Sequence, residues 1–134
     1  MPVENTISIA DKAHTLLHCT IEILTKCNWR CEHCYIPKHD SDGLSLDVLK
    51  KIFRELRTMK TFELILTGGE MFLRNDIMDI LSDARQLGFN LQLFTNLSLL
   101  SEKSRDFIPQ ANIEKISCTI FSLNPDVHDA ITNC

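Results

Sequence analysis

The chain has 134 residues, a length typical of one domain with room for a hydrophobic core. Apolar residues make up 44% of the chain and charged residues 24%, as in soluble globular proteins, and the formal net charge of -4 argues against a general nucleic-acid-binding protein. No apolar run approaches the ~20 residues of a membrane span, and the N-terminus lacks the basic start and apolar core of a signal peptide. We therefore expect a cytoplasmic protein without nucleic-acid or membrane partners, whose clustered cysteines serve metal or redox chemistry.

The first half of the chain predicts two strands with one helix between them. Residues 16–25, LLHCTIEILT, are apolar and rich in β-branched side chains, which is typical of a buried strand. A helix is expected from about Ser45 to Lys60, with Ser45 as its N-cap. Its apolar stripe comprises Val48, Leu49, Ile52, Phe53, Leu56 and Met59. Residues 62–70, FELILTGGE, predict a second strand that ends in a glycine pair.

The second half continues the alternation of helices and strands. A helix beginning near Asn75 is followed by a strand at 89–96, and a shorter helix at 101–110 precedes a strand at 113–121. Residues 124–132 predict a last helix, with asparagine as N-cap and proline at the first helical position. The stripe of the helix near Asn75 comprises Ile77, Ile80, Leu81, Ala84 and Leu87.

Strands that alternate with helices predict parallel pairing through right-handed crossovers, hence an α/β fold whose helices cover the sheet. No linker or low-complexity segment interrupts residues 1–134, so one domain is expected. Cys19 and Cys118 fall inside the first and fourth predicted strands, where we expect them to be small buried apolar residues.

Three cysteines directly follow the first predicted strand, in the segment CNWRCEHCY at 27–35. The carboxyl ends of parallel strands are where ligands bind in such folds. A 4Fe–4S cluster held by three thiolates keeps one iron open for another ligand, as a reactive centre requires. The alternative is a structural zinc site, which needs four ligands and would recruit His33 or His39 as the fourth.

The spacing Cys-x3-Cys-x2-Cys after the first strand resembles the signature of the radical S-adenosylmethionine (radical SAM) enzyme superfamily. The sequence Gly-Gly-Glu at 68–70 follows the second strand, where the family has its "GGE" segment, and Thr-Asn at 95–96 ends the third, where many members have "TNG". The stretch CTIFSLNPDVHDAIT at 118–132 resembles the family's "ISLYGATPEVHDAIT". These motifs stand in the family's order and cover nearly the whole chain.

The resemblance implies two cofactors, a 4Fe–4S cluster and S-adenosylmethionine. Cys27, Cys31 and Cys34 would bind three irons, and the fourth iron would chelate the amino and carboxylate groups of the methionine part. His33 matches a position that usually holds an aromatic residue near the adenine, and Tyr35 would help to wall that pocket.

The remaining motifs imply the other contacts to S-adenosylmethionine. Backbone at Gly68 and Gly69 would approach the ligand and accept from its ammonium group, so a side chain at Gly69 is expected to displace the ligand without moving a cysteine. Asn96 and Thr119 would offer hydrogen bonds to the carboxylate and ribose. Glu70 is expected to brace the loop rather than touch the ligand directly.

The implied activity is reductive cleavage of S-adenosylmethionine to a 5′-deoxyadenosyl radical, with an electron from an external donor, followed by hydrogen abstraction from a substrate. Phe121 stands where other members have aspartate or tyrosine, which favours the type found in peptide maturases, so a ribosomally made peptide is the leading substrate class. The alternatives are a non-catalytic metal-binding module, holding zinc or an iron–sulfur cluster, and an inactive fragment.

The family's core has six β/α units in an open TIM-like barrel, and this sequence predicts four. We therefore expect residues 1–134 to be the N-terminal four units of a partial (β/α)6 barrel, truncated from a longer chain and weakly active or inactive alone. An open sheet edge would also permit a homodimer.

Overall fold

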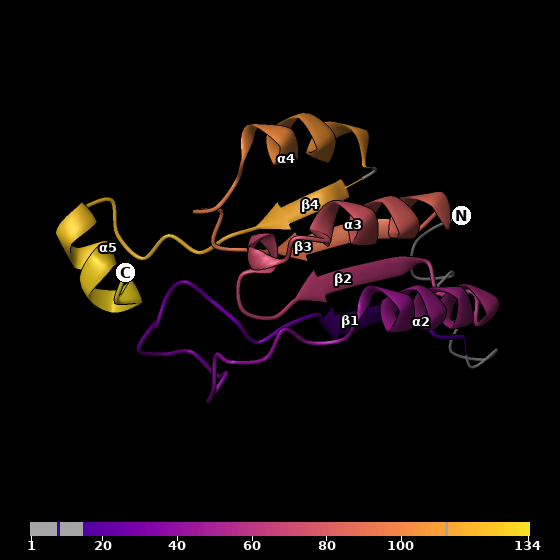
Figure 1. Ribbon diagram of the computed structural model, residues 1–134, viewed down its shortest axis with the longest axis horizontal. Helices are drawn as coiled ribbons and strands as arrows, with labels where there is room; N and C mark the ends of the chain where they lie inside the picture. Colours follow the sequence, from indigo (N-terminus) through magenta and orange to yellow (C-terminus); the bar gives the residue numbers. More distant parts are fainter. Residues whose placement is uncertain (1–7, 9–14, 112) are drawn as a thin grey trace.

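The computed structural model describes residue 8, residues 15–111 and residues 113–134 (Figure 1). The N-terminal residues for which we predict no signal peptide lie mostly outside the residues that the structure describes. Strands and helices alternate in the order β1 (His18–Glu22), α2 (Leu46–Thr58), β2 (Glu63–Thr67), η1 (Met71–Leu73), α3 (Ile77–Gln86), β3 (Asn90–Phe94), α4 (Glu102–Phe107), η2 (Ile108–Gln110), β4 (Ile113–Ser117) and α5 (Pro125–Thr132). None of these helices is long and apolar enough to cross a membrane.

The described strands form one parallel sheet in the order β1-β2-β3-β4. Each strand pairs with the next along the chain, as the right-handed β/α crossovers of a barrel require. The predicted α/β class and its four parallel strands are therefore confirmed. Parallel pairing brings the carboxyl ends of all four strands to one edge.

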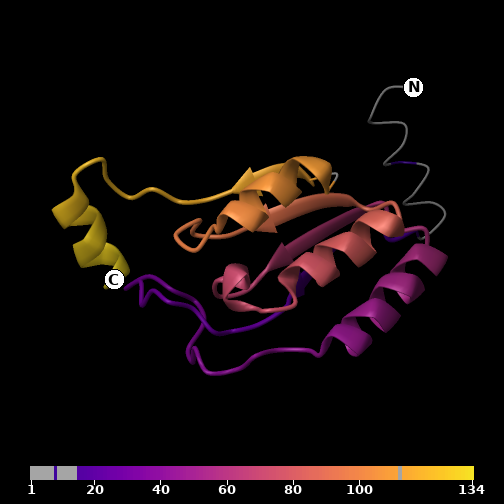
Figure 2. The same cartoon turned by 45° about the horizontal axis from the view of Figure 1, so that its top comes forward.

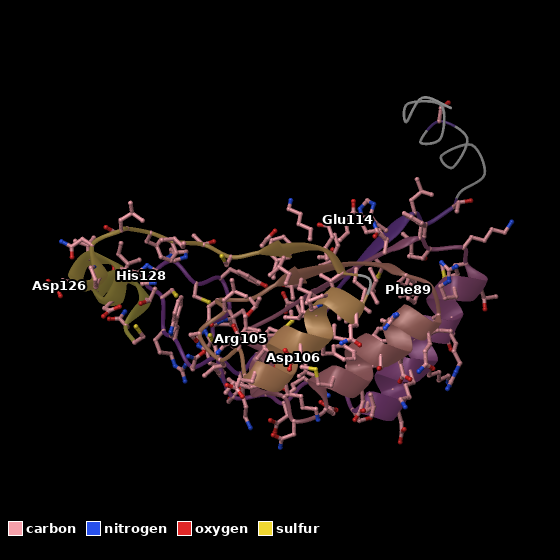
Figure 3. The ribbon with its side chains drawn as sticks, turned by 90° about the horizontal axis from the view of Figure 1, so that it is seen from above. Phe89, Arg105, Asp106, Glu114, Asp126 and His128 are labelled. Atoms are coloured by element: carbon pink, nitrogen blue, oxygen red, sulfur yellow. The ribbon has the colours of Figure 1, made fainter. Side chains whose placement is uncertain are left out.

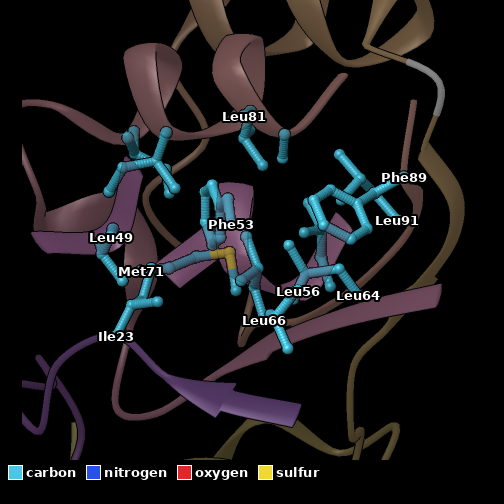
Figure 4. Close-up of a cluster of buried hydrophobic side chains, with 14 of the residues drawn as sticks. Ile23, Leu49, Phe53, Leu56, Leu64, Leu66, Met71, Leu81, Phe89 and Leu91 are labelled. Carbon is cyan, nitrogen blue, oxygen red and sulfur yellow. The ribbon is translucent and has the colours of Figure 1, made fainter. Parts of the chain in front are cut away.

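The helices α2, α3 and α4 lie on one face of the sheet, as Figure 2 shows. The core between these layers is apolar: Leu64 and Leu66 of β2 and Leu91 of β3 are completely buried, together with Phe53 of α2 and Phe89 (Figure 4). Alternate side chains along a strand point to opposite faces, so burial alternates along β2 and β3. This layer supplies the rigid base for the loops at the carboxyl edge.

The other face of the sheet carries polar side chains. Thr20 and Glu22 of β1 are exposed, and Gln92 Nε2 donates to Glu63 Oε1 at 2.7 Å across β2 and β3. Ordinary parallel sheets bury both faces under helices and are apolar on both. A polar face without helices is the inner wall expected of an open barrel.

Two helix starts follow local sequence rules. The Ser45 side chain accepts from the N–H of Val48 at 3.4 Å, and the Asn124 side chain accepts from the N–H of Asp126 at 3.0 Å. The predicted starts of α2 and α5 are therefore confirmed. By contrast, α3 begins at Ile77, two residues later than predicted.

Several predicted boundaries and burials are wrong. Every strand has five residues and is shorter than predicted, because pairing with the neighbouring strands stops where the loops diverge. Val48 and Met59 were expected in the core-facing stripe of α2 but are 44% and 54% exposed. Cys118 is exposed, because β4 ends at Ser117.

Candidate functional site

A cavity of about 250 Å³ lies at the carboxyl edge of the sheet, where the loops after all four strands meet. All expected site residues except Glu70 line it: Cys27, Cys31, His33, Cys34, Tyr35, Gly68, Gly69, Asn96 and Thr119. The fold therefore brings together four motifs that are separated in the sequence. The surface of the lining is mostly apolar and includes several aromatic rings.

The three thiols of the β1–α2 loop share this cavity. Burial raises the pKa of the Cys27 thiol, and Glu70 and Cys34 raise it further, against the effect of the Trp29 N–H, which donates to Cys27 Sγ at 3.4 Å. Burial likewise raises the pKa of Cys31, with smaller contributions from the neighbouring cysteines. Like charges gathered in one hollow oppose ionisation, so a cationic metal group would be favoured there.

The arrangement of these thiols bears on the kind of metal group they fit. Among the residues that the structure describes, no three His, Cys, Asp or Glu side chains converge closely enough to hold a single metal ion. A zinc ion needs all of its sulfur ligands at about 2.3 Å from one point. In a 4Fe–4S cluster each thiolate binds a different iron, so the thiols of a cluster site need not converge on one point.

Glu70 ties the end of β2 to the end of β3 beneath the cavity. Its carboxylate is completely buried and accepts from Thr95 Oγ1 at 2.7 Å, from the Asn96 N–H at 2.7 Å and from the Phe72 N–H at 3.0 Å. These hydrogen bonds satisfy the carboxylate within the protein. The geometry matches a bracing role, and the sequence pattern gave no indication of the partners.

Asn96 also has partners within the protein. Its Nδ2 donates to Asn28 Oδ1 at 3.0 Å, and its Oδ1 accepts from the N–H and Oγ of Ser98. The side chain thereby joins the β3 end to the cysteine loop. Its expected hydrogen bond to the carboxylate or ribose of S-adenosylmethionine stays a prediction and would require these partners to exchange.

The glycine pair allows the chain after β2 to approach the cysteine loop. Gly68 has φ +134°, a conformation that side chains disfavour. A Cβ on Gly69 would lie 2.0 Å from the carbonyl oxygen of Lys26 and 2.6 Å from that of Thr25. Because Lys26 directly precedes Cys27, the clash of a Gly69 side chain with this backbone argues against the expectation that no cysteine would move.

Three expected ligand contacts lie around the rim of the cavity. The His33 ring packs against the Phe121 ring with centroids 4.6 Å apart, so these two rings form one wall. Tyr35 is 69% exposed, and its hydroxyl donates to Glu22 Oε1 at 2.8 Å. Thr119 is exposed beyond the end of β4, not inside a strand as predicted.

The helix α5 holds the cysteine loop from outside the sheet. The N–H groups of Arg30 and Glu32 donate to the carbonyls of Thr132 and Ile131 at 2.9 and 3.1 Å, and Asn133 Nδ2 donates to the Arg30 carbonyl at 3.0 Å. The rings of Trp29 and His128 pack edge to face. Figures 2 and 3 show α5 beyond the edge of the sheet, Figure 3 labels His128 on this helix, and Figure 2 shows the C-terminal end of α5 beside the loop. We call these contacts the α5 latch.

Weakening the α5 latch should loosen the cysteine loop without unfolding the sheet. Asn133→Ala removes the side-chain donor to the Arg30 carbonyl and a residue suited to its left-handed backbone, φ 49°. We expect the free energy of local opening of the cysteine loop to fall by about 1 kcal/mol. Hydrogen exchange at the amides of Arg30 and Glu32 should then be about fivefold faster. Mass spectrometry of exchanged peptides measures this effect.

The matched control is Asn90→Ala, because the Asn90 side chain bonds Glu114 at the opposite end of the sheet. It should leave exchange in the cysteine loop unchanged. Equal exchange in both variants would contradict a stabilising role for the α5 latch.

The sequence of the chain is similar to a family model and to proteins of known name. The family model described as the Radical SAM superfamily matches residues 21–133. A GTP 3′,8-cyclase of Crocosphaera subtropica is 32% identical over 123 residues, covering 83% of this chain and 35% of the relative. A putative glycyl-radical enzyme activating enzyme of Methanocaldococcus jannaschii is 27% identical, covering 91% of this chain and 47% of the relative.

Solved structures share the fold. Streptococcus suis SuiB bound to the precursor peptide SuiA superposes with a TM-score of 0.80 at 14% identity, over 97% of this chain and 30% of SuiB. SuiB bound to S-adenosylmethionine gives a TM-score of 0.80 at 15% identity, over 97% of this chain and 32% of that structure. The chain thus spans less than half the length of these proteins.

Proposed function

The chain belongs to the radical SAM superfamily, and from this premise we propose that Cys27, Cys31 and Cys34 hold a 4Fe–4S cluster that binds S-adenosylmethionine at its open iron. The observation that carries the proposal is the single cavity shared by the three thiols, the glycine pair and the ends of β3 and β4. A cluster held by these three cysteines would supply, once reduced, the single electron for cleavage of S-adenosylmethionine to methionine and a 5′-deoxyadenosyl radical.

The other lining residues bind and orient the ligand in this proposal. The carbonyls of Gly68 and Gly69 accept from the ammonium group, and Asn96 and Thr119 donate to the carboxylate and ribose. The rings of His33 and Tyr35 wall the adenine. Glu70 holds the β2 and β3 ends in place through its buried hydrogen bonds and touches no ligand.

We propose a ribosomally made peptide as the substrate. The sequence Phe-Ser-Leu at 121–123 and the fold shared with SuiB, which binds a precursor peptide, support this choice. The identity with GTP 3′,8-cyclase supports a nucleotide as the second candidate. Hydrogen transfer from labelled peptide or labelled GTP into 5′-deoxyadenosine distinguishes the two.

The proposed activity requires two partners: the remainder of the barrel and an electron donor. The four β/α units are the N-terminal part of a six-unit barrel, completed by further chain or by a second copy pairing at the open sheet edge. An external donor in the reducing cytoplasm supplies the electron. Because part of the wall around S-adenosylmethionine would come from the missing units, residues 1–134 alone should form little 5′-deoxyadenosine.

Anaerobic reconstitution with iron and sulfide tests the proposal. We expect about four irons and four sulfides per chain and, after chemical reduction of the cluster, an electron paramagnetic resonance signal that changes when S-adenosylmethionine is added. The chain without added iron is the control. A stoichiometric zinc ion that resists exchange by iron would overturn the cluster in favour of a structural metal site.

A further inference from the structure

A histidine outside the cysteine motif lies against the third thiol. His39 Nε2 is 3.4 Å from Cys34 Sγ, within hydrogen-bond distance for a sulfur atom. Both side chains are half-buried and line the same cavity as the other thiols. The contact therefore belongs to the edge of the site where the proposed cluster would lie.

The direction of this hydrogen bond follows from the chemistry of metal binding. A cysteine that binds iron does so as a thiolate, which has no proton and can only accept. His39 must then donate from Nε2 to keep the contact, so a proton lies on that nitrogen. The corresponding donor to Cys27 is the main-chain N–H of Trp29, which no side-chain substitution removes.

We propose that His39 is a positioning residue that donates to the Cys34 thiolate and raises the reduction potential of the cluster. This inference rests on the proposed function. A reduced cluster carries one more negative charge, so an N–H dipole on a ligand sulfur stabilises the reduced form more than the oxidised form. Partial burial strengthens the effect, because water screens the dipole less.

The test compares His39→Leu, His39→Gln and the matched control His18→Leu. Leucine removes the donor, glutamine retains an N–H donor, and His18 is exposed at the start of β1, at the opposite end of the strand. Each reconstituted protein is titrated with a reductant and followed by electron paramagnetic resonance. We expect His39→Leu to lower the reduced-to-oxidised ratio at a fixed potential about fivefold, which is about 40 mV for one electron.

His39→Gln should restore most of the reduced-to-oxidised ratio that His39→Leu loses. His18→Leu should have the same ratio as the unchanged protein. An unchanged potential in His39→Leu with full iron content would overturn the inference. Loss of iron in both His39 variants would also overturn it, because His39 would then hold the loop or bind metal itself. Failure of the unchanged protein to assemble any cluster would instead overturn the proposed function, and this outcome is visible before any variant is compared.

Discussion

Single replacement of Cys27, Cys31 or Cys34 by alanine is expected to abolish cluster assembly. Each thiolate binds one iron, and the described residues bring no other cysteine of this loop into the cavity to replace it. Iron and sulfide content after anaerobic reconstitution measures the effect, which we expect to fall from about four of each per chain to near zero. Visible absorption of the cluster gives an independent reading.

The matched controls are Cys118→Ala and Cys19→Ala. Cys118 is the stricter one, because it is exposed and lines the same cavity from the end of β4. Cys19 is half-buried within β1. Both controls should retain the full cluster. Retention of the cluster after loss of one of the three motif cysteines, or its loss in Cys118→Ala, would refute the assignment of ligands.

Replacement of Gly69 by alanine is expected to destabilise the fold and the cysteine loop together. The new Cβ would overlap the backbone carbonyl oxygen of Lys26 at 2.0 Å, and neither atom can rotate away, because the backbone fixes the positions of both. Overpacking of this kind costs about 3 kcal/mol. Urea unfolding measures the lost stability, and iron content after reconstitution measures the displacement of Cys27.

Gly88→Ala is the matched control for this experiment. Gly88 has φ +78°, but its Cβ would meet only the Arg57 side chain at 4.0 Å. Gly88→Ala should lower the free energy of unfolding by about 1 kcal/mol, because of backbone strain, and leave the cluster intact. A Gly69→Ala protein that is stable and loaded but unresponsive to S-adenosylmethionine would show that the glycine serves ligand binding rather than packing.

The sequence by itself determined the features that depend on neighbouring residues. The N-caps Ser45 and Asn124 bond amides within three residues of themselves, so local preference was enough to predict them. The alternation of strands and helices predicted the parallel sheet, because parallel strands need a crossover. The cysteine spacing and the glycine pair could be recognised in the sequence, because each motif is short and contiguous.

The tertiary structure alone decided the contacts between segments that are distant in the chain. Glu70 bonds Thr95, which follows it by 25 residues, and Asn133 bonds the carbonyl of Arg30, which precedes it by 103 residues. Local propensity carries no information about such pairs, because they form only when packing fixes the loops relative to one another. For the same reason the exposure of Cys118 could not be predicted: it depends on where pairing between β3 and β4 stops, which the residues of one strand do not determine.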